Sequence, residues 1–196
     1  ENAQRILTAA AERNVVVVTD EVFAGVVFDP ERAPMVHPGA RTGTDGPLVI
    51  TINGASKLFA APDLKLSWMV AGGPYASRAP AVEALSVAND LYLNCSSLSQ
   101  ALVPALFAGR EPTGIELVGR LAQSRAVVSE LVESCEALSM TPPAGGIHAT
   151  IAVDPTICPL NDEELVVELL RRQEVELHPG YLYGIDDRPY LIASLL

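Results

Sequence analysis

The sequence predicts an α/β fold in which part of a mainly parallel sheet is followed by a smaller α+β domain. Four consecutive valines, residues 15–18, are typical of a strand that is buried on both faces, as strands of parallel sheets are. Two further apolar runs, residues 48–52 and 64–71, indicate two more strands that are joined by a short turn. After residue 73, helical patterns mixed with short strands indicate a second unit, with helices on one face of a small sheet.

The first predicted domain comprises residues 1–73. It starts with an alanine-rich helical pattern that ends at Asn14, a residue suited to the C-cap of a helix. A segment rich in proline and glycine, without periodicity, then separates the valine strand from the next strand. The predicted elements are a helix over 2–13, the valine strand, a surface loop over 28–47, and strands over 48–55 and 65–71.

The second predicted domain comprises residues 74–196. Gly72 and Gly73 end the preceding strand, and Pro74 can open a helix because proline is tolerated in the first helical turn. Asn161 is followed by three acidic residues and is typical of a helix start, since acids suit the positive end of the helix dipole. The predicted helices cover 75–91, 97–109, 113–136 and 161–173, and the predicted strands cover 147–153, 174–178 and 189–195.

Two residues at the ends of predicted strands are candidates for chemistry. Lys57 lies in a turn of small residues directly after a buried strand, and lysine is rarely buried unless its amine has a task. Asp20 ends the valine strand, and ligands of open α/β sheets bind at the carboxyl ends of strands. A lysine and an acid that face each other there suit the two ends of pyridoxal phosphate (PLP). The amine would form a Schiff base with the aldehyde, and the carboxylate would pair with the protonated ring nitrogen.

Five segments of the chain, in this order and spacing, resemble the class I/II aminotransferases, which are PLP-dependent enzymes of fold type I. They are Thr19-Asp20-Glu21-Val22-Phe23, Asn53-Gly54-Ala55-Ser56-Lys57, Leu64-Lys65-Leu66-Ser67-Trp68, His178-Pro179-Gly180-Tyr181 and Tyr190-Leu191-Ile192-Ala193-Ser194. Together they span nearly the whole chain, which makes the resemblance fairly specific. Because family members are much longer, the resemblance implies a C-terminal portion. Residues 1–73 would belong to the large cofactor-binding domain, and residues 74–196 would form the small domain without its final helix.

The resemblance assigns four residues to a cofactor site. Lys57 would form the Schiff base with PLP and later move the proton between the substrate α-carbon and the cofactor. Asp20 would keep the ring nitrogen protonated. Phe23 stands where the family has a tyrosine, so it can pack against the ring but has no hydroxyl to donate. Lys65 stands where the family has a phosphate-binding arginine, and it keeps the charge without the bidentate fork.

The resemblance also bears on the substrate. The family has an arginine near the C-terminus that binds the substrate α-carboxylate, but Ile192 stands at that position and Arg188 is out of register. The turn at residues 178–181 resembles a segment near the substrate pocket, which makes Tyr181 and Tyr183 candidates for that pocket. The resemblance further implies a homodimer, since the active sites of the family lie at a dimer interface.

Composition narrows the classes of partner. The net charge of −11 disfavours a nucleic-acid partner, because phosphate contacts need clustered Lys and Arg. No apolar run is long enough to span a bilayer, so no membrane partner is expected. The three cysteines and three histidines are widely spaced, which indicates neither a disulfide framework nor a metal site. Core thiols suit the reducing cytoplasm.

The predicted function is therefore PLP-dependent transfer of an amino group between an amino acid and a 2-oxo acid through a Schiff base at Lys57. A lyase, decarboxylase or racemase on the same fold is an alternative within enzymes. A non-catalytic fragment or effector-sensing module is an alternative of another class, which Phe23 and the missing arginine favour. The retained pair of Asp20 and Lys57 disfavours it, because a module without chemistry has no physical need for either residue.

Overall fold

The computed structural model describes residues 2–29, 31 and 46–196 of the chain. These residues divide into two compact units. The first contains the described residues up to Gly25 and from residue 46 to Ile115, and the second contains those from Val26 to residue 31 and from Glu116 to Leu196. The predicted domain boundary after residue 73 falls inside the first unit, and as a domain assignment it stays a prediction. Most of the predicted surface loop over 28–47 lies outside the described residues.

Helix α1 (Asn2–Glu12) ends as predicted at Asn14. The Asn14 backbone is left-handed, with φ of 52°. Its amide donates a 3.2 Å hydrogen bond to the carbonyl of Ala11, and the amide of Val15 donates a 2.9 Å bond to the carbonyl of Ala10. These two bonds form a Schellman motif, which satisfies carbonyls that the end of a helix leaves without partners. The C-cap then turns the chain into the first strand.

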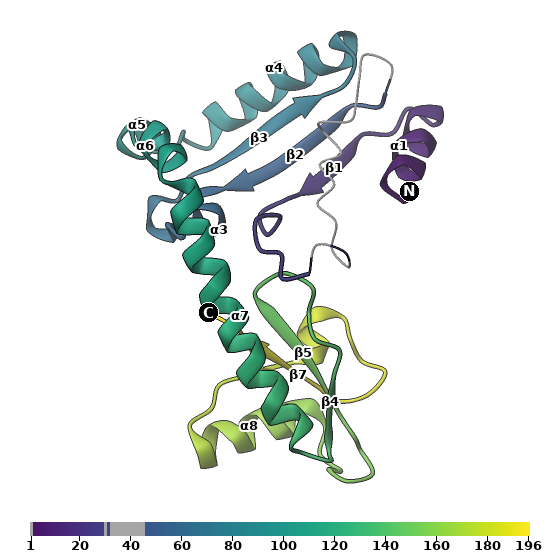
Figure 1. Ribbon diagram of the computed structural model, residues 1–196. Helices are drawn as coiled ribbons and strands as arrows, with labels where there is room; N and C mark the ends of the chain where they lie inside the picture. Colours follow the sequence, from purple (N-terminus) through teal and green to yellow (C-terminus); the bar gives the residue numbers. More distant parts are fainter. Residues whose placement is uncertain (1, 30, 32–45) are drawn as a thin grey trace. The chain divides into compact units, whose positions relative to one another are not determined.

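The sheet of the first unit has the strand order β1–β2–β3 (Figure 1). The strands are β1 (Val17–Asp20), β2 (Val49–Gly54) and β3 (Ser67–Gly72). β1 pairs with β2 in parallel, whereas β3 runs antiparallel to β2. The predicted α/β class is confirmed, and one of the two described pairings is of the predicted parallel kind.

The valine strand is less buried than predicted. It begins at Val17 instead of Val15, and the side chains of Val15 and Val18 are 53% and 59% exposed. β1 is an edge strand among the three described strands, so it has a strand neighbour on one side only. The prediction of burial on both faces is therefore wrong for the part of the chain that the structure describes.

The connection between β2 and β3 contains the short helix α3 (Ala55–Leu58) and a 3₁₀ turn, Pro62–Leu64. After β3 come α4 (Tyr75–Leu91), α5 (Ser97–Ala101) and α6 (Val103–Ala108). The prediction of one helix over 97–109 is wrong. Pro104 has no amide hydrogen and lies in the first turn of α6, so the ladder of the preceding helix cannot continue through it. The Trp68 and Phe107 rings, with centroids 6.0 Å apart, pack β3 against α6.

The second unit is a four-stranded antiparallel sheet with helices. Its strands, in the spatial order β4–β5–β7–β6, are β4 (Leu138–Met140), β5 (His148–Val153), β7 (Tyr190–Ser194) and β6 (His178–Pro179). Its helices are the C-terminal part of α7 (Arg110–Glu133) and α8 (Asp162–Gln173), and a 3₁₀ turn covers Gly180–Tyr183. The buried residues Ala149, Ile151 and Val153 recur at every second position of β5 and so share one face, and Ala152 on the other face is buried as well.

The start of α8 is as predicted, but the strand predicted to follow it is wrong in extent. Asn161 and Glu164 form a capping box, in which each side chain accepts a hydrogen bond from the backbone amide of the other residue. At the other end, Glu174 adopts a left-handed conformation that ends the helix. Strand pairing then begins only at His178, and it covers two residues instead of the predicted 174–178.

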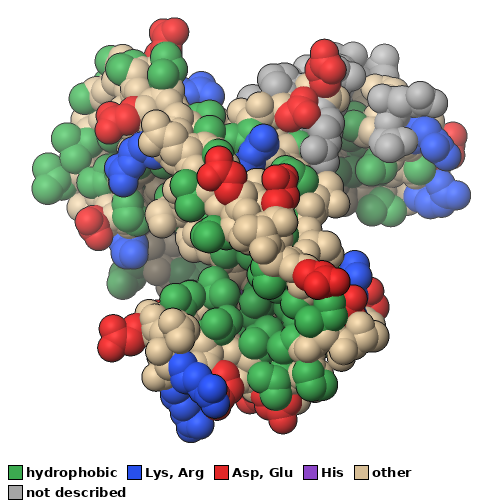
Figure 2. Space-filling view, turned by 60° about the horizontal axis from the view of Figure 1, so that its bottom comes forward, with side chains coloured by type: hydrophobic (Ala, Val, Ile, Leu, Met, Phe, Trp, Pro, Cys, Tyr) green, Lys and Arg blue, Asp and Glu red, His purple; other side chains and the backbone are tan. Residues whose placement is uncertain are grey.

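Apolar side chains reach the surface over broad areas in Figure 2. The most exposed large ones are at and after the end of α4, where Leu91, Tyr92 and Leu93 are 77%, 85% and 87% exposed. Among the described residues, no helix has both the length and the apolar character needed to cross a membrane.

Candidate functional site

Three strand ends meet at one edge of the sheet in the first unit. The parallel register pairs Asp20 with Ile52, so β1 ends two residues before β2 and at the same end of the sheet. The antiparallel register pairs Gly54 with Ser67, so β3 begins where β2 ends. The four residues that the sequence assigns to a cofactor lie in or beside the turns at this edge: Asp20, Phe23, Lys57 and Lys65.

Lys57 lies in α3, the single helical turn that follows β2. Ala55 starts this turn, is fully buried, and donates a backbone hydrogen bond of 2.8 Å to the carbonyl of Leu66. The Lys57 side chain is half-buried, and its Nζ lies 6.0 Å from the centroid of the Phe23 ring. Because an ammonium group is attracted to the face of an aromatic ring, Phe23 holds this amine near the turn that follows β1.

Asp20 is exposed, and the turn after β1 orients its carboxylate. Its Oδ1 accepts a hydrogen bond of 3.0 Å from the backbone amide of Val22. This is an Asx turn, a role that aspartate commonly has after a strand. A carboxylate can accept at both oxygens, so the bond fixes the orientation of the group and leaves it able to accept further donors.

Lys65 is exposed and lies two residues before β3, directly after the 3₁₀ turn. Lys57 and Lys65 are the two lysines of the chain, and the other members of its 13 Lys and Arg residues are arginines. A chain that uses arginine everywhere else thus has both of its lysines at one sheet edge. The antiparallel direction of β3 brings Lys65 there, since a parallel β3 would start at the opposite edge.

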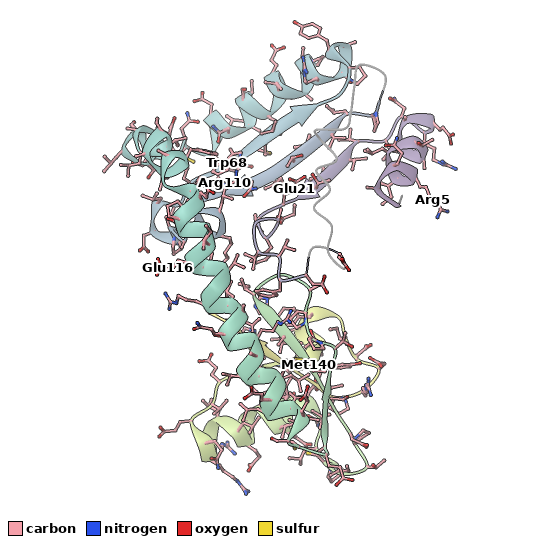
Figure 3. The ribbon with its side chains drawn as sticks, viewed as in Figure 1. Arg5, Glu21, Trp68, Arg110, Glu116 and Met140 are labelled. Carbon is pink, nitrogen blue, oxygen red and sulfur yellow. The ribbon has the colours of Figure 1, made fainter. Side chains whose placement is uncertain are left out.

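Sequence reasoning missed the residues that tie these strand ends together. The Asn53 side chain donates a 3.2 Å hydrogen bond to the carbonyl of Glu21, which lies directly beyond the end of β1 (Figure 3). Asn53 Oδ1 also accepts a 2.7 Å bond from the amide of Gly54. The hydroxyls of Thr19 and Thr51 are hydrogen-bonded across the same pair of strands at 3.1 Å. Polar residues at the carboxyl ends of both strands were the signal that could have identified them.

A cavity of about 770 Å³ in the first unit lies elsewhere. It is lined by residues of β3, α4 and α6 that include Trp68, Val82 and Phe107, and its lining contains none of the four predicted cofactor residues. The candidate site consists of the side chains beside the shared strand ends, and this cavity is separate from them. Within the described residues, no group of three or more His, Cys, Asp or Glu side chains gathers as it would around a metal ion.

The residues assigned to the substrate lie in the second unit. Ile192, at the position expected for an arginine, is 4% exposed and pairs with Thr150 on one side and His178 on the other. The Tyr183 hydroxyl is hydrogen-bonded to Nδ1 of His178 at 2.9 Å, and the two rings are stacked. Tyr181 is 47% exposed, and its amide donates to Asp162 Oδ2 at 3.2 Å.

Two charged groups of the second unit have shifted pKa values. The hydrogen bond from Arg188 Nε to the Tyr190 hydroxyl, 3.1 Å long, is the main cause that raises the pKa of Arg188. This bond also keeps the guanidinium beside the start of β7. Hydrogen bonds from the Thr156 hydroxyl and amide lower the pKa of Asp154, and the hydroxyl has the larger effect.

The chain matches the family model described as aminotransferase class I and II over residues 1–190. It is 23% identical over 180 residues to the glutamate-pyruvate aminotransferase AlaA of Haemophilus influenzae, an alignment that covers 90% of this chain and 44% of that protein. It is 26% identical over 202 residues to the putative aminotransferase YugH of Bacillus subtilis, covering 99% of this chain and 47% of that protein. The chain thus spans about half the length of the curated relatives that it matches.

Among solved structures, the fold is similar to that of an alanine aminotransferase from Pyrococcus furiosus. The TM-score is 0.84 at 22% sequence identity, and the match covers 99% of this chain and 48% of that one. The predicted fold type I is thereby confirmed. Since the family model matches residues 1–190 of a chain of 196, the chain belongs to the class I and II aminotransferase family.

Proposed function

We propose that the protein is a PLP-dependent aminotransferase, which transfers an amino group between an amino acid and a 2-oxo acid. One observation carries the proposal: the parallel register of β1 on β2 puts the Asp20 carboxylate and the Lys57 turn at the same sheet edge. The names of the similar curated proteins, a glutamate-pyruvate aminotransferase and a putative aminotransferase, support the same class of reaction.

The residues at this edge fit PLP as a donor set. The half-buried amine of Lys57 suits the aldehyde, and the oriented carboxylate of Asp20 suits a protonated ring nitrogen. Lys65 adds a positive charge at the same edge for a phosphate group, as a point charge without the bidentate fork of arginine. Phe23 leaves the set of cofactor contacts incomplete, because its ring has no hydroxyl that could donate a hydrogen bond to PLP.

When bound, PLP supplies an aldehyde that receives the amino group and a conjugated ring that stabilises negative charge at the substrate α-carbon. Lys57 holds the aldehyde end and later serves as the base that takes the proton from the α-carbon. Asp20 keeps a proton at the ring nitrogen, since a nearby carboxylate favours the charged form of a basic partner. Phe23 keeps the Lys57 amine at this edge.

The substrate carboxylate needs a partner other than residue 192. Ile192 is buried in β7, so it offers neither charge nor exposure. Tyr181 and Tyr183, which are 47% and 44% exposed in the 3₁₀ turn before β7, are our candidates for the substrate pocket. A phenol donates one hydrogen bond to a carboxylate but adds no charge. We therefore expect weaker binding of amino acids than a bidentate arginine would provide.

We further propose that the protein is a cytoplasmic homodimer. The exposed residues Leu91, Tyr92 and Leu93 support this proposal, because exposed clusters of large apolar side chains are typical of interaction surfaces. Sedimentation equilibrium of the protein and of its Leu93→Glu variant would test it. A monomeric wild-type protein at micromolar concentration would contradict the homodimer.

A lyase or decarboxylase is a second candidate, which the buried apolar side chain of Ile192 favours. Without a fixed clamp, a substrate can present a bond other than Cα–H to the cofactor ring. Product analysis separates the reactions: a 2-oxo acid that forms only when an amino acceptor is present indicates transamination. Release of carbon dioxide or ammonia without an acceptor indicates the alternative.

The visible absorption spectrum of the protein with added PLP, followed by borohydride reduction and peptide mapping, tests the cofactor assignment. We expect a yellow species and a reduced label on Lys57. The two lysines of the chain provide a matched pair, because Lys57→Ala should lose the label and Lys65→Met should keep it with weaker binding. A label on Lys65 in the wild-type protein, or none on either lysine, would contradict the proposal.

A further inference from the structure

Ser99 in α5 is a buried polar residue at an unusual place. Ser99 is 7% exposed, and no polar residue among those that the structure describes is more buried. Its hydroxyl donates a hydrogen bond of 2.9 Å to the backbone carbonyl of Leu64, 35 residues earlier in the chain. A buried hydroxyl is costly to keep unless it has a partner. The bond to Leu64 therefore indicates that this contact is specific.

The residue next to this bond, Lys65, has a strained backbone. Its φ of 48° and ψ of 40° lie in the left-handed region, which residues with a Cβ atom rarely adopt. Such a conformation persists when the surrounding structure enforces it. The Ser99 hydroxyl holds the carbonyl before Lys65. The Cys95 Sγ lies 3.9 Å from the carbonyl of Lys65 itself and adds a weaker contact.

The same segment is joined to the Lys57 turn. The carbonyl of Leu66 accepts the 2.8 Å hydrogen bond from the amide of Ala55, two residues before Lys57. Ala55, Phe59 and Leu66 form one buried cluster, against which Cys95 packs. A Cβ atom on Gly54 would lie only 3.1 Å from the Leu66 carbonyl oxygen, so the two segments already approach closely.

We infer that Ser99 is a positioning residue for cofactor binding. By holding the Leu64 carbonyl, it keeps Lys65 in the left-handed conformation that directs this lysine to the site edge. The inference rests on the proposed function, and it assigns Ser99 an effect on the phosphate end of PLP rather than on the aldehyde end. A residue that only fills the core would affect both ends alike.

The test compares PLP with pyridoxal, which has the same aldehyde but no phosphate. The affinity of each compound is measured from its absorption on titration of the wild-type, Ser99→Ala and Ser99→Cys proteins. Ser99→Cys keeps the number of side-chain heavy atoms and weakens the donor, so it remains informative if the smaller residue impairs folding. The matched control is Ser97→Ala, which removes an exposed hydroxyl from the same helix.

We expect the ratio of the PLP affinity to the pyridoxal affinity to fall about tenfold in both Ser99 variants, as for one lost hydrogen bond that orients a charge. In Ser97→Ala the ratio should stay as in the wild type. In a Lys65→Met background, the Ser99 substitution should change the ratio no further. Hydrogen exchange, read without any cofactor, should show faster exchange of the Lys65 and Ala55 amides in the Ser99 variants only.

Different failures have different meanings. An equal loss of affinity for both compounds, or an unchanged ratio in Ser99→Cys, would overturn the role of Ser99 while leaving the proposed function intact. If neither compound attaches at Lys57 of the wild-type protein, the proposed function fails and the role of Ser99 fails with it.

Discussion

The Nζ atom of Lys57 lies 6.0 Å from the centroid of the Phe23 ring, so residues from the turns after β2 and β1 are held together. A cation over an aromatic face contributes about 0.5–1 kcal/mol where water has access. We expect a coupling free energy of about 0.5 kcal/mol between the two side chains because the distance is at the upper limit of the interaction. A double-mutant cycle of Phe23→Leu and Lys57→Met, measured by urea unfolding, checks this value. Additive effects of the two substitutions would show that the ring does not hold the amine.

Asp20 accepts a hydrogen bond from the Val22 amide and is also predicted to pair with the cofactor ring nitrogen. The substitution Asp20→Asn should separate these two roles. Asp20→Asn keeps an oxygen that can accept from the Val22 amide, so we expect nearly unchanged stability. The lost charge should slow exchange of the substrate α-proton with solvent by about 10²-fold or more, the range typical of groups that hold or move protons in a reaction. Proton NMR of an amino acid in deuterated buffer with added PLP measures the exchange. If Asp20→Asn exchanged the α-proton at the wild-type rate, Asp20 would have no role at the cofactor site.

Gly54 sits where the Lys57 turn meets the start of β3. A Cβ atom there would lie 3.1 Å from the Leu66 carbonyl oxygen and 3.3 Å from Ser67 Cβ. Its φ of −166° is ordinary extended backbone, so crowding alone should make Gly54→Ala destabilising, by about 1–3 kcal/mol. Gly114 in α7 is the matched control. Beyond its chain neighbours and the backbone of its own helix, no heavy atom lies within 4 Å of the added Cβ, and Gly114→Ala should stabilise the protein by about 0.5–1 kcal/mol. Chemical denaturation should therefore show a lower free energy of unfolding for Gly54→Ala and a higher one for Gly114→Ala.

Ile192 is a core residue of β7, so substitutions at this position should change the stability of the protein. With 4% of the side chain exposed, Ile192→Val should lower the free energy of unfolding by about 0.5–1.5 kcal/mol and Ile192→Ala by about 2–5 kcal/mol. Ile192→Arg should be at least as damaging, because it buries a charge without a partner. Urea unfolding gives these values. A stable Ile192→Arg protein with tighter binding of amino acids would instead show that residue 192 faces a substrate pocket.

Asp154 should make the stability of the protein depend on acid pH. Because the Thr156 bonds lower its pKa in the folded state, the stabilisation is fully present above its ordinary value of 3.8 and is lost as the pH falls through the lower, folded pKa. Thr156→Ala removes the hydroxyl hydrogen bond, which is the largest cause of the lowered pKa. The difference between the urea midpoints near pH 6 and near pH 3 should therefore be smaller than in the wild type. An equal difference in the two proteins would contradict the assignment.

Much of the local structure follows from short sequence patterns. Asn14 ends α1 and Asn161 with Glu164 starts α8, because side chains and backbone amides only a few residues apart make these bonds. The break at Pro104 is equally local, and the prediction of one helix over 97–109 overlooked it. The prediction of a strand over 174–178 is wrong because Glu174 adopts a left-handed conformation that ends α8. The observed strand covers only His178 and Pro179.

The sequence by itself determined which residues are available for chemistry: Lys57 after one strand, Asp20 after another, and Lys65 before a third. Only the tertiary structure decided that these residues share one edge. Parallel and antiparallel strands have the same side-chain period, so an apolar run does not reveal the direction of its strand. The antiparallel pairing of β3 with β2 places Lys65 beside the Lys57 turn. The bond from Ser99 to Leu64 likewise joins residues 35 positions apart, and such a contact exists only once the chain has folded.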